Sequence, residues 1–203
     1  GALSATWKSR YRAPFGPLVP GFVHVPYGKT EPTAKAITEK TAAIIVEPIQ
    51  GESGIKVPPE GFLKELRELC DKSGTLLIFD EVQTGFGRTG KLFACEHSGV
   101  TPDILCLAKS LAGGLPFGVT VAREDVMAAL KMGEHSSTFG GNPLICAAAS
   151  AAIDVVLEEK LPERAAVLGK HFMEKLEETH QKYKIVREVR GRGLMIGVEF
   201  RFD

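Results

Sequence analysis

The chain has 203 residues, with 25 basic and 25 acidic side chains and no net charge at neutral pH. Its length allows one substantial hydrophobic core or a core and part of a second, and the balanced charge argues against a nucleic-acid or anionic-membrane partner. The apolar runs are too short to span a bilayer, and the first eight residues lack the charged-then-apolar layout of a signal peptide.

The first half of the chain is expected to alternate strands and helices. Residues 1–34 are rich in glycine and proline and are predicted to be irregular. A strand is predicted at 43–47 and a helix at 58–73, whose apolar residues recur at helical spacing and whose end is marked by Gly74. An apolar strand at 76–80 leads into a glycine-rich loop that reaches Gly90.

The middle of the chain continues this alternation. Strands are predicted at 104–107 and 118–122, separated by a glycine-containing loop, and a short helix is predicted at 125–131. Alternating strands and helices favour an α/β fold with a mainly parallel sheet.

The last quarter of the chain changes pattern. Two helices are predicted, at 143–160 with Pro143 in its first turn and at 163–182. Two short strands follow, at 185–189 and 194–200. Helix, helix, strand, strand is an α+β order, so we predict a boundary near residue 155, with a large domain at 1–154 and a smaller one beginning at 155–203.

Two of the predicted strands end near charged residues. Asp80 ends the apolar run 76–80, and Lys109 directly follows the apolar run 104–108. Strands of a parallel sheet are buried on both faces, and their carboxyl ends are where α/β proteins place ligands. A lysine that forms a Schiff base and an aspartate that pairs with a pyridinium nitrogen are what a pyridoxal 5'-phosphate (PLP) site needs. The alternatives are an aspartate that caps the next segment and a solvated lysine.

Further residues extend this candidate site. Gln83 can reach the phenolic oxygen of a PLP ring, and Val82 can pack on one ring face. The loop 136–143 offers Ser137, Thr138 and backbone N–H groups before a helix, which suits either a phosphate contact or an ordinary helix entry. Glu47 and Glu52 follow the first strand and suit a basic substrate group, an arginine or a structural ion pair.

Two other kinds of site are not favoured. Residues 85–90 match a G-x-G-x-x-G pattern, but the glycines begin five residues after the strand end, and 91–99 is too short for the crossover helix of a dinucleotide fold. The histidines and the four cysteines show no metal-ligand spacing, so no metal site is expected. The scattered cysteines are predicted to be buried thiols in a reducing cytoplasm.

Four ordered motifs resemble a known family, the class III aminotransferases. They are residues Ile45–Glu52, Phe79–Gly90, Pro102–Ile104 with Leu107–Lys109, and Ser137–Pro143. Within this family, residues 1–6 and 14–18 look most like the acetylornithine and ornithine branch. The resemblance implies a PLP-dependent transferase of fold type I. It also implies transfer of an ω-amino group from acetylornithine or ornithine to 2-oxoglutarate.

The resemblance also assigns roles residue by residue. Lys109 matches the Schiff-base lysine, Asp80 the pyridinium partner, Val82 the residue under the ring and Gln83 the phenolic-oxygen contact. Ser137 and Thr138 match a segment that reaches the phosphate in the neighbouring subunit of a homodimer. Glu52 matches a glutamate that holds the substrate-binding arginine between half-reactions.

The chain departs from the family pattern at both ends. Family members extend further in both directions, where part of the phosphate site and the arginine that binds the substrate carboxylate lie. Arg192 does not match that arginine and is expected in a turn between the last two strands. The chain therefore resembles the central part of such an enzyme. The alternatives are a non-catalytic module that binds PLP or oligomerises, and another class III activity such as acetyl-lysine or γ-aminobutyrate transamination or a lyase.

Overall fold

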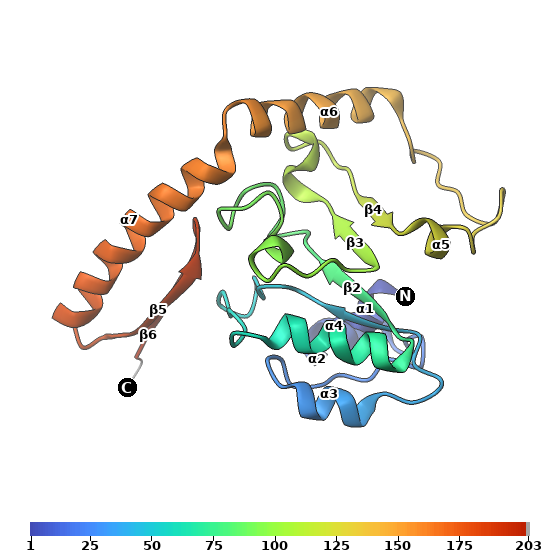
Figure 1. Ribbon diagram of the computed structural model, residues 1–203, viewed down its shortest axis with the longest axis horizontal. Coiled ribbons are helices and arrows are strands. Elements are labelled where there is room, and N and C mark those ends of the chain that lie inside the picture. The colour runs from blue at the N-terminus through green and yellow to red at the C-terminus, as the bar shows by residue number, and fades with distance from the viewer. Residues whose placement is uncertain (202–203) are drawn as a thin grey trace.

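Three apolar strands run in the same direction through the centre of the molecule. The computed structural model describes residues 1–201 (Figure 1). Strands β1 (Ala43–Val46), β2 (Leu76–Asp80) and β3 (Ile104–Leu107) are parallel, and β4 (Val119–Ala122) pairs antiparallel with β3. The strand order is β1-β2-β3-β4, which confirms the mainly parallel sheet.

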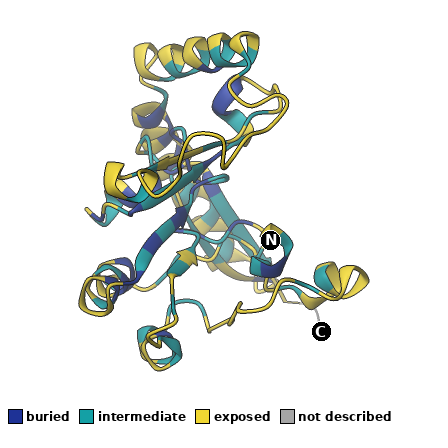
Figure 2. Cartoon of the chain, turned by 90° about the vertical axis from the view of Figure 1, so that its right-hand side faces the viewer, coloured by how far each residue is buried: buried dark blue, intermediate teal, exposed yellow. Residues whose placement is uncertain are grey.

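Helix α4 (Phe62–Ser73) covers one face of this sheet. It begins later than predicted because Gly61 is in the left-handed region, with φ 85°, and it ends at Gly74 as predicted, with φ 70°. Leu66, Leu77 and Phe79 are at most 1% exposed in the core between helix and strands. Burying a side chain of this size contributes about 2 kcal/mol. Figure 2 shows buried residues gathered along the central strands.

The N-terminal segment is more ordered than the glycine and proline content suggests. It contains α1 (Ala2–Ala5), α2 (Ser9–Arg12), a 3₁₀ helix at Ala13–Phe15 and α3 (Thr30–Ala36). The prediction that residues 1–34 are irregular is therefore wrong for these elements. Pro32 lies in the first turn of α3, where a missing N–H group costs no intrahelical hydrogen bond.

Asp103, just before β3, joins three parts of the large sheet. Its carboxylate accepts hydrogen bonds from the Leu77 N–H at 2.7 Å, from Arg67 of α4 at 2.8 Å and from Arg123 after β4 at 2.6 Å. The residue is 3% exposed. A buried carboxylate with these three donors fixes the position of β3 relative to β2 and α4.

Helix α5 (Glu124–Met127) is shorter than the predicted helix 125–131. The chain leaves α-helical geometry because Ala129 and Leu130 donate to carbonyl groups three residues back. Helix α6 (Pro143–Glu158) begins with Pro143 as predicted, and the side chain of Asn142 accepts from the Leu144 N–H at 3.0 Å.

The C-terminal elements form a helix and a hairpin. Helix α7 (Leu161–Lys182) precedes β5 (Val186–Arg192) and β6 (Met195–Phe200), which pair antiparallel. Arg192 is the last residue of β5, opposite Met195, and not part of the connecting turn as predicted. The predicted boundary near residue 155 falls inside α6, and the division into two domains stays a prediction.

The glycine-rich loop 85–90 packs against these C-terminal elements. A Cβ atom at Gly87 would lie 3.2 Å from Pro162, and one at Gly90 would lie 3.0 Å from Ala166, both on α7. Leu194 in the β5–β6 turn donates to the Arg88 carbonyl at 2.9 Å. The glycines therefore permit close approach of α7 to the loop.

All four cysteines are free thiols. Cys70 and Cys95 are buried, whereas Cys106 and Cys146 are only half-buried, so the prediction of buried thiols is right for two of them. Within residues 1–201 there is no group of three or more acidic, histidine or cysteine side chains arranged to hold a metal ion. None of the described helices is long and apolar enough to cross a membrane.

Candidate active site

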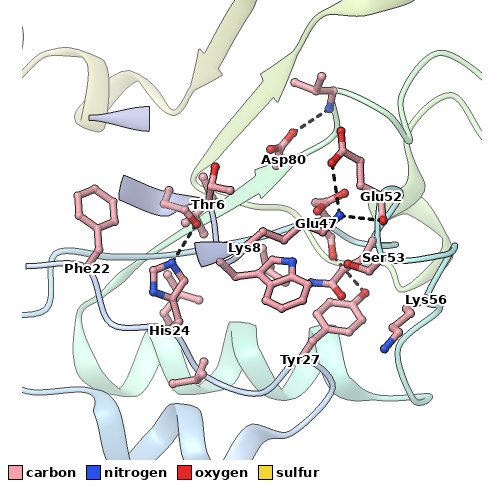
Figure 3. A pocket seen from close by; sticks show the side chains of 18 of the residues that line it. Thr6, Lys8, Phe22, His24, Tyr27, Glu47, Glu52, Ser53, Lys56 and Asp80 are labelled. Atoms are coloured by element: carbon pink, nitrogen blue, oxygen red, sulfur yellow. Dashed lines mark hydrogen bonds and ion pairs between the residues drawn. The ribbon is translucent and has the colours of Figure 1, made fainter. Parts of the chain in front are cut away.

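A cavity of about 1080 Å³ lies at the carboxyl ends of β1 and β2. Six of the predicted site residues line it: Glu47, Glu52, Asp80, Val82, Gln83 and Lys109. The N-terminal segment supplies another part of the wall, including Lys8 and Tyr27 (Figure 3). Ser137 and Thr138 do not line the cavity.

Asp80 and Lys109 reach this cavity because β2 and β3 are parallel neighbours. Asp80 is in register with Cys106 on β3, so both strands end at the same edge of the sheet. Lys109 follows the end of β3 and is the first residue of a 3₁₀ helix, Lys109–Ala112. Among residues 1–201, neither Asp80 nor Lys109 takes part in an ion pair with another side chain. Each charge is therefore available to a bound molecule.

The carboxylate of Asp80 makes one local hydrogen bond. Its Oδ1 accepts from the Val82 N–H at 3.1 Å, as Figure 3 shows. This contact is the cap-like arrangement considered as the alternative role for Asp80, and it also fixes the side chain toward the cavity. The same geometry therefore suits both interpretations of Asp80, as a cap of the following segment and as a partner for a ring nitrogen.

Lys109 has an unusual backbone conformation. Its φ of 54° lies in the left-handed region, which costs a residue with a Cβ atom on the order of 1 kcal/mol or more. Such conformations cluster at functional sites because the surrounding structure maintains them. Here the 3₁₀ helix behind Lys109 buries Leu111 and Ala112 against α6, which holds the strained residue in place.

Glu81, beside Asp80, has a structural role that the sequence analysis missed. It is 1% exposed, and its carboxylate accepts from the Thr84 hydroxyl at 2.7 Å and from the Ala94 and Cys95 N–H groups at 2.8 Å each. These bonds anchor the loop that carries Val82 and Gln83. The only available signal was an acidic residue inside an otherwise apolar and glycine-rich stretch.

Glu47, just after β1, also lines the cavity. Its Oε2 accepts from the Gly51 N–H at 3.0 Å. Burial raises the pKa of Glu47, the Gly51 hydrogen bond lowers it, and the charges of Asp80 and Glu52 raise it again, so that the net pKa lies above its ordinary value. Lys109 acts in the opposite direction. These opposing effects place Glu47, Asp80, Glu52 and Lys109 within one electrostatic environment.

Gly51 and Tyr27 shape the same wall. A Cβ atom at Gly51 would overlap the side-chain amide of Gln83, so glycine is required there for Gln83 to keep its position. The Tyr27 hydroxyl lies 3.2 Å from the Glu47 carbonyl oxygen and 3.0 Å from that of Pro48. Burial, and then the charge of Glu47, raise the pKa of Tyr27 well above its ordinary value, which keeps the hydroxyl protonated as a donor.

Glu52 is at the open side of the cavity and contacts Lys8. The Lys8 Nζ atom lies 3.6 Å from Glu52 Oε2 and donates to the Glu52 carbonyl at 3.0 Å (Figure 3). The Glu52 side chain is 64% exposed, so this pair is a weak one. The sequence analysis did not predict Lys8 because the contact joins residues 44 positions apart.

Ser137 and Thr138 lie in an exposed loop between α5 and α6 (Figure 1). Their position on the surface does not bring them to the cavity of their own chain. A contact with the cofactor of a neighbouring subunit stays a prediction.

The lining residues suit PLP. The Asp80 carboxylate and the Lys109 amine lie at the ends of neighbouring strands and have no ion-pair partner in residues 1–201. Val82 and Gln83 add an apolar group and an amide beside them. These four groups match four parts of PLP. The carboxylate suits the pyridine nitrogen, the amine suits the aldehyde, the apolar group suits the ring face and the amide suits the phenolic oxygen.

Comparison with known proteins gives a consistent result. The family model described as "Aminotransferase class-III" matches residues 1–203. An acetylornithine aminotransferase from Methanopyrus kandleri is 62% identical over 203 residues, which are all of this chain and 51% of that protein. The chain thus spans about half the length of the curated relatives it matches.

Solved structures agree with the fold. A crystal structure of the ornithine aminotransferase from Toxoplasma gondii superposes with a TM-score of 0.96 and is 45% identical, over 98% of this chain and 48% of that one. A second structure from T. gondii, with a TM-score of 0.95, 45% identity and the same coverage, is described as having partial occupancy of PLP at its active site. The sheet and helices therefore have the fold of PLP-dependent aminotransferases, as predicted.

Proposed function

Because the chain belongs to the class-III aminotransferase family, whose members depend on PLP, we propose that it forms the cofactor-binding core of an acetylornithine/ornithine-type aminotransferase. The proposed reaction moves the ω-amino group of acetylornithine or ornithine to 2-oxoglutarate. The names of the relatives support this choice of amino donor over acetyl-lysine or γ-aminobutyrate.

One observation carries the proposal. Asp80 ends β2, and Lys109 follows the end of β3, the parallel neighbour of β2. Both line the same cavity, and neither forms an ion pair with any described residue. An aspartate and a lysine so close to one cavity would ordinarily be expected to pair with a neighbour. A ligand with a basic ring nitrogen and an electrophilic carbon could therefore bind to the Asp80 carboxylate and the Lys109 amine.

Each residue then has a defined task. When bound, PLP supplies an aldehyde carbon and a ring that accepts electron density. With the group bound, the Lys109 Nζ atom would be the amine that holds the aldehyde carbon and that moves a proton at the substrate. The Asp80 carboxylate would accept a hydrogen bond from the ring nitrogen and favour its protonated form. Val82 would pack against the ring, and Gln83 would donate to its phenolic oxygen.

Glu52 belongs to the substrate side of the same site. Its carboxylate is exposed toward the cavity and can hold a cationic group of the substrate or of the protein. Lys8 is the cation beside it in this structure. We propose that Glu52 exchanges such partners during the two halves of the reaction.

The proposed working form is a homodimer in the cytoplasm. Ser137 and Thr138 are exposed and lie in a loop that does not line their own cavity, which is the arrangement expected of residues that serve a neighbouring subunit. The same exposure favours a second candidate function for a single copy of the chain. On its own, it would bind PLP weakly and without turnover.

An activity assay separates these candidates. Purified chain with PLP, acetylornithine and 2-oxoglutarate should form glutamate, and Lys109→Ala should abolish this rate. Lys56→Ala is the matched control, since Lys56 also lines the cavity but does not follow a sheet strand that ends there. A wild-type rate equal to that of Lys109→Ala would leave only the non-catalytic candidate.

A further inference from the structure

We propose that Arg190, on β5 of the C-terminal hairpin, is a positioning residue for the substrate side of the site. It holds the turn that carries Glu52 in place at the cavity, although it does not line the cavity itself. The proposal rests on the proposed function, in which Glu52 belongs to the substrate site.

The turn that carries Glu52 spans residues 50–56. Gln50 and Lys56 form an isolated antiparallel bridge, with the Lys56 N–H donating to the Gln50 carbonyl at 2.9 Å. Gly54 and Ile55 are both in the left-handed region, with φ of 87° and 53°. A turn with a strained non-glycine residue needs contacts from outside to keep its shape.

Arg190 supplies such a contact. Its Nε donates to the Gly54 carbonyl at 2.8 Å. Its Nη1 donates to Glu188 at 2.6 Å and to Glu199 at 2.7 Å, and the side chain is 16% exposed. The two carboxylates that accept from Nη1 fix the direction of the guanidinium, so its Nε–H is aimed at the turn. Loss of a charge-assisted hydrogen bond of this kind should change an equilibrium constant roughly tenfold or more.

The backbone of β6 supports the same turn. A Cβ atom at Gly197 would lie 3.0 Å from the Gly54 carbonyl oxygen and 3.1 Å from the Ile55 Cβ. The glycine therefore lets the hairpin approach the turn closely enough for Arg190 to bond. On its other side the turn contacts Lys8, which donates to the Glu52 carbonyl. Glu52 thus lies between one contact from the N-terminal segment and one from the hairpin.

The first test measures the turn itself, without any cofactor. In Arg190→Gln, amide hydrogen exchange of the 50–56 segment should become about tenfold faster or more. Arg187→Gln is the matched control, because Arg187 lies on the same strand and pairs with Glu199 at 3.0 Å but is 66% exposed. Its exchange should equal that of the wild type. Equal exchange in the Arg190 and Arg187 variants would overturn the proposal.

A second variant perturbs the contact from the hairpin backbone. Gly197→Ala keeps Arg190 but places a methyl group against Gly54 and Ile55. Exchange in the 50–56 segment should again accelerate, while exchange in β2 stays unchanged. Unchanged exchange in the turn would show that the hairpin does not hold it, and would overturn the proposal even if Arg190→Gln failed to fold.

The last test asks whether Arg190 acts through Glu52. With PLP-loaded protein, the apparent Kd for ornithine should rise about tenfold in Arg190→Gln and should recover in part in Arg190→Lys. In a Glu52→Gln background, Arg190→Gln should cause no further loss. Independent, additive losses would overturn a role through Glu52.

Loading of Lys109 with PLP is measured in the same samples. If the wild type does not load, the proposed function is wrong. The hydrogen-exchange comparison needs no cofactor and still decides the role of Arg190.

Discussion

Asp80, the last residue of β2, is in register with Cys106 of β3, three positions before Lys109. Parallel pairing therefore brings an acidic and a basic side chain to the same edge of the sheet from two separate stretches of chain. Because both line one cavity without pairing, the local sheet geometry is what makes this edge a candidate site.

Removing the charge of Asp80 should weaken PLP binding and catalysis together. Asp80→Asn keeps the size of the side chain but loses the ion pair with a protonated ring nitrogen. Loss of one partner of such a pair costs at least about 2 kcal/mol, so the Kd for PLP should rise more than tenfold. Absorbance titration with PLP measures this change.

The control for this substitution is Asp71→Asn. Asp71 forms an exposed ion pair with Arg67 on α4, away from the cavity, so PLP affinity should stay at the wild-type value. If Asp80→Asn bound PLP as tightly as Asp71→Asn, the assignment of Asp80 would be wrong.

Asp103 should contribute strongly to folding stability. Asp103→Ala leaves Arg67 without its buried partner and removes the acceptor for the Leu77 N–H. We expect a loss of roughly 3 kcal/mol in the free energy of unfolding, measured by urea denaturation. Asp125→Ala removes an exposed partner of Arg123 and should lower stability far less than Asp103→Ala does.

The same residue predicts an acid-sensitive stability. Burial raises the pKa of Asp103, but the Leu77 N–H and then Arg67 lower it by more, so the folded-state pKa lies below that of the unfolded chain. The stabilisation is present above the unfolded pKa of about 3.9 and is lost as the pH falls through the folded value. Unfolding free energy should therefore drop as the pH falls below about 4. The drop should be smaller in Asp103→Ala, and an equal drop in both proteins would contradict this explanation.

Several features of the site could be predicted from the sequence because they depend on local pattern. Apolar runs that end on or just before charged residues identified Asp80 and Lys109, and the motif order identified the family. The N-terminal wall could not be predicted in this way. Lys8 and Tyr27 reach the cavity through contacts with residues 44 and 20 or 21 positions away, which no local pattern records.

Glu81 should be essential for the loop behind the site. The two carboxylate oxygens of Glu81 now accept from the backbone N–H groups of Ala94 and Cys95. In Glu81→Gln, one of these oxygens becomes an NH₂ group, which would face an N–H donor. A buried donor left without a partner costs about 1–3 kcal/mol. Thermal unfolding should show this loss, while Glu96→Gln, whose carboxylate caps the Phe93 N–H at an exposed position, should cost less.

The glycine-rich loop shows why a pattern needs its structural context. The G-x-G-x-x-G spacing at residues 85–90 is common to phosphate-binding loops, yet here Gly87 and Gly90 admit α7, and the Arg88 carbonyl receives the N–H of Leu194. The sequence argued against a dinucleotide site because the glycines begin too far from the strand end and residues 91–99 are too short for a crossover helix. It could not show what the glycines contact, because α7 begins more than 70 residues later.

A mixing experiment tests the proposed dimer. Lys109→Ala should be inactive, and Ser137→Ala combined with Thr138→Ala should be strongly impaired if these residues serve the neighbouring subunit. Refolding the two variants together should restore up to about a quarter of wild-type activity, since a mixed two-fold dimer contains one intact site. Mixed protein with no more activity than the two separate variants would contradict the shared site.

The most direct measurement is peptide mapping of the chain after incubation with PLP and reduction with borohydride. The account predicts a single dominant modification on Lys109, with Lys8 and Lys56, which line the same cavity, left unmodified. Asp80→Asn should lower its yield. Modification spread over surface lysines, or none on Lys109, would contradict the central claim that the ends of β2 and β3 form a PLP site.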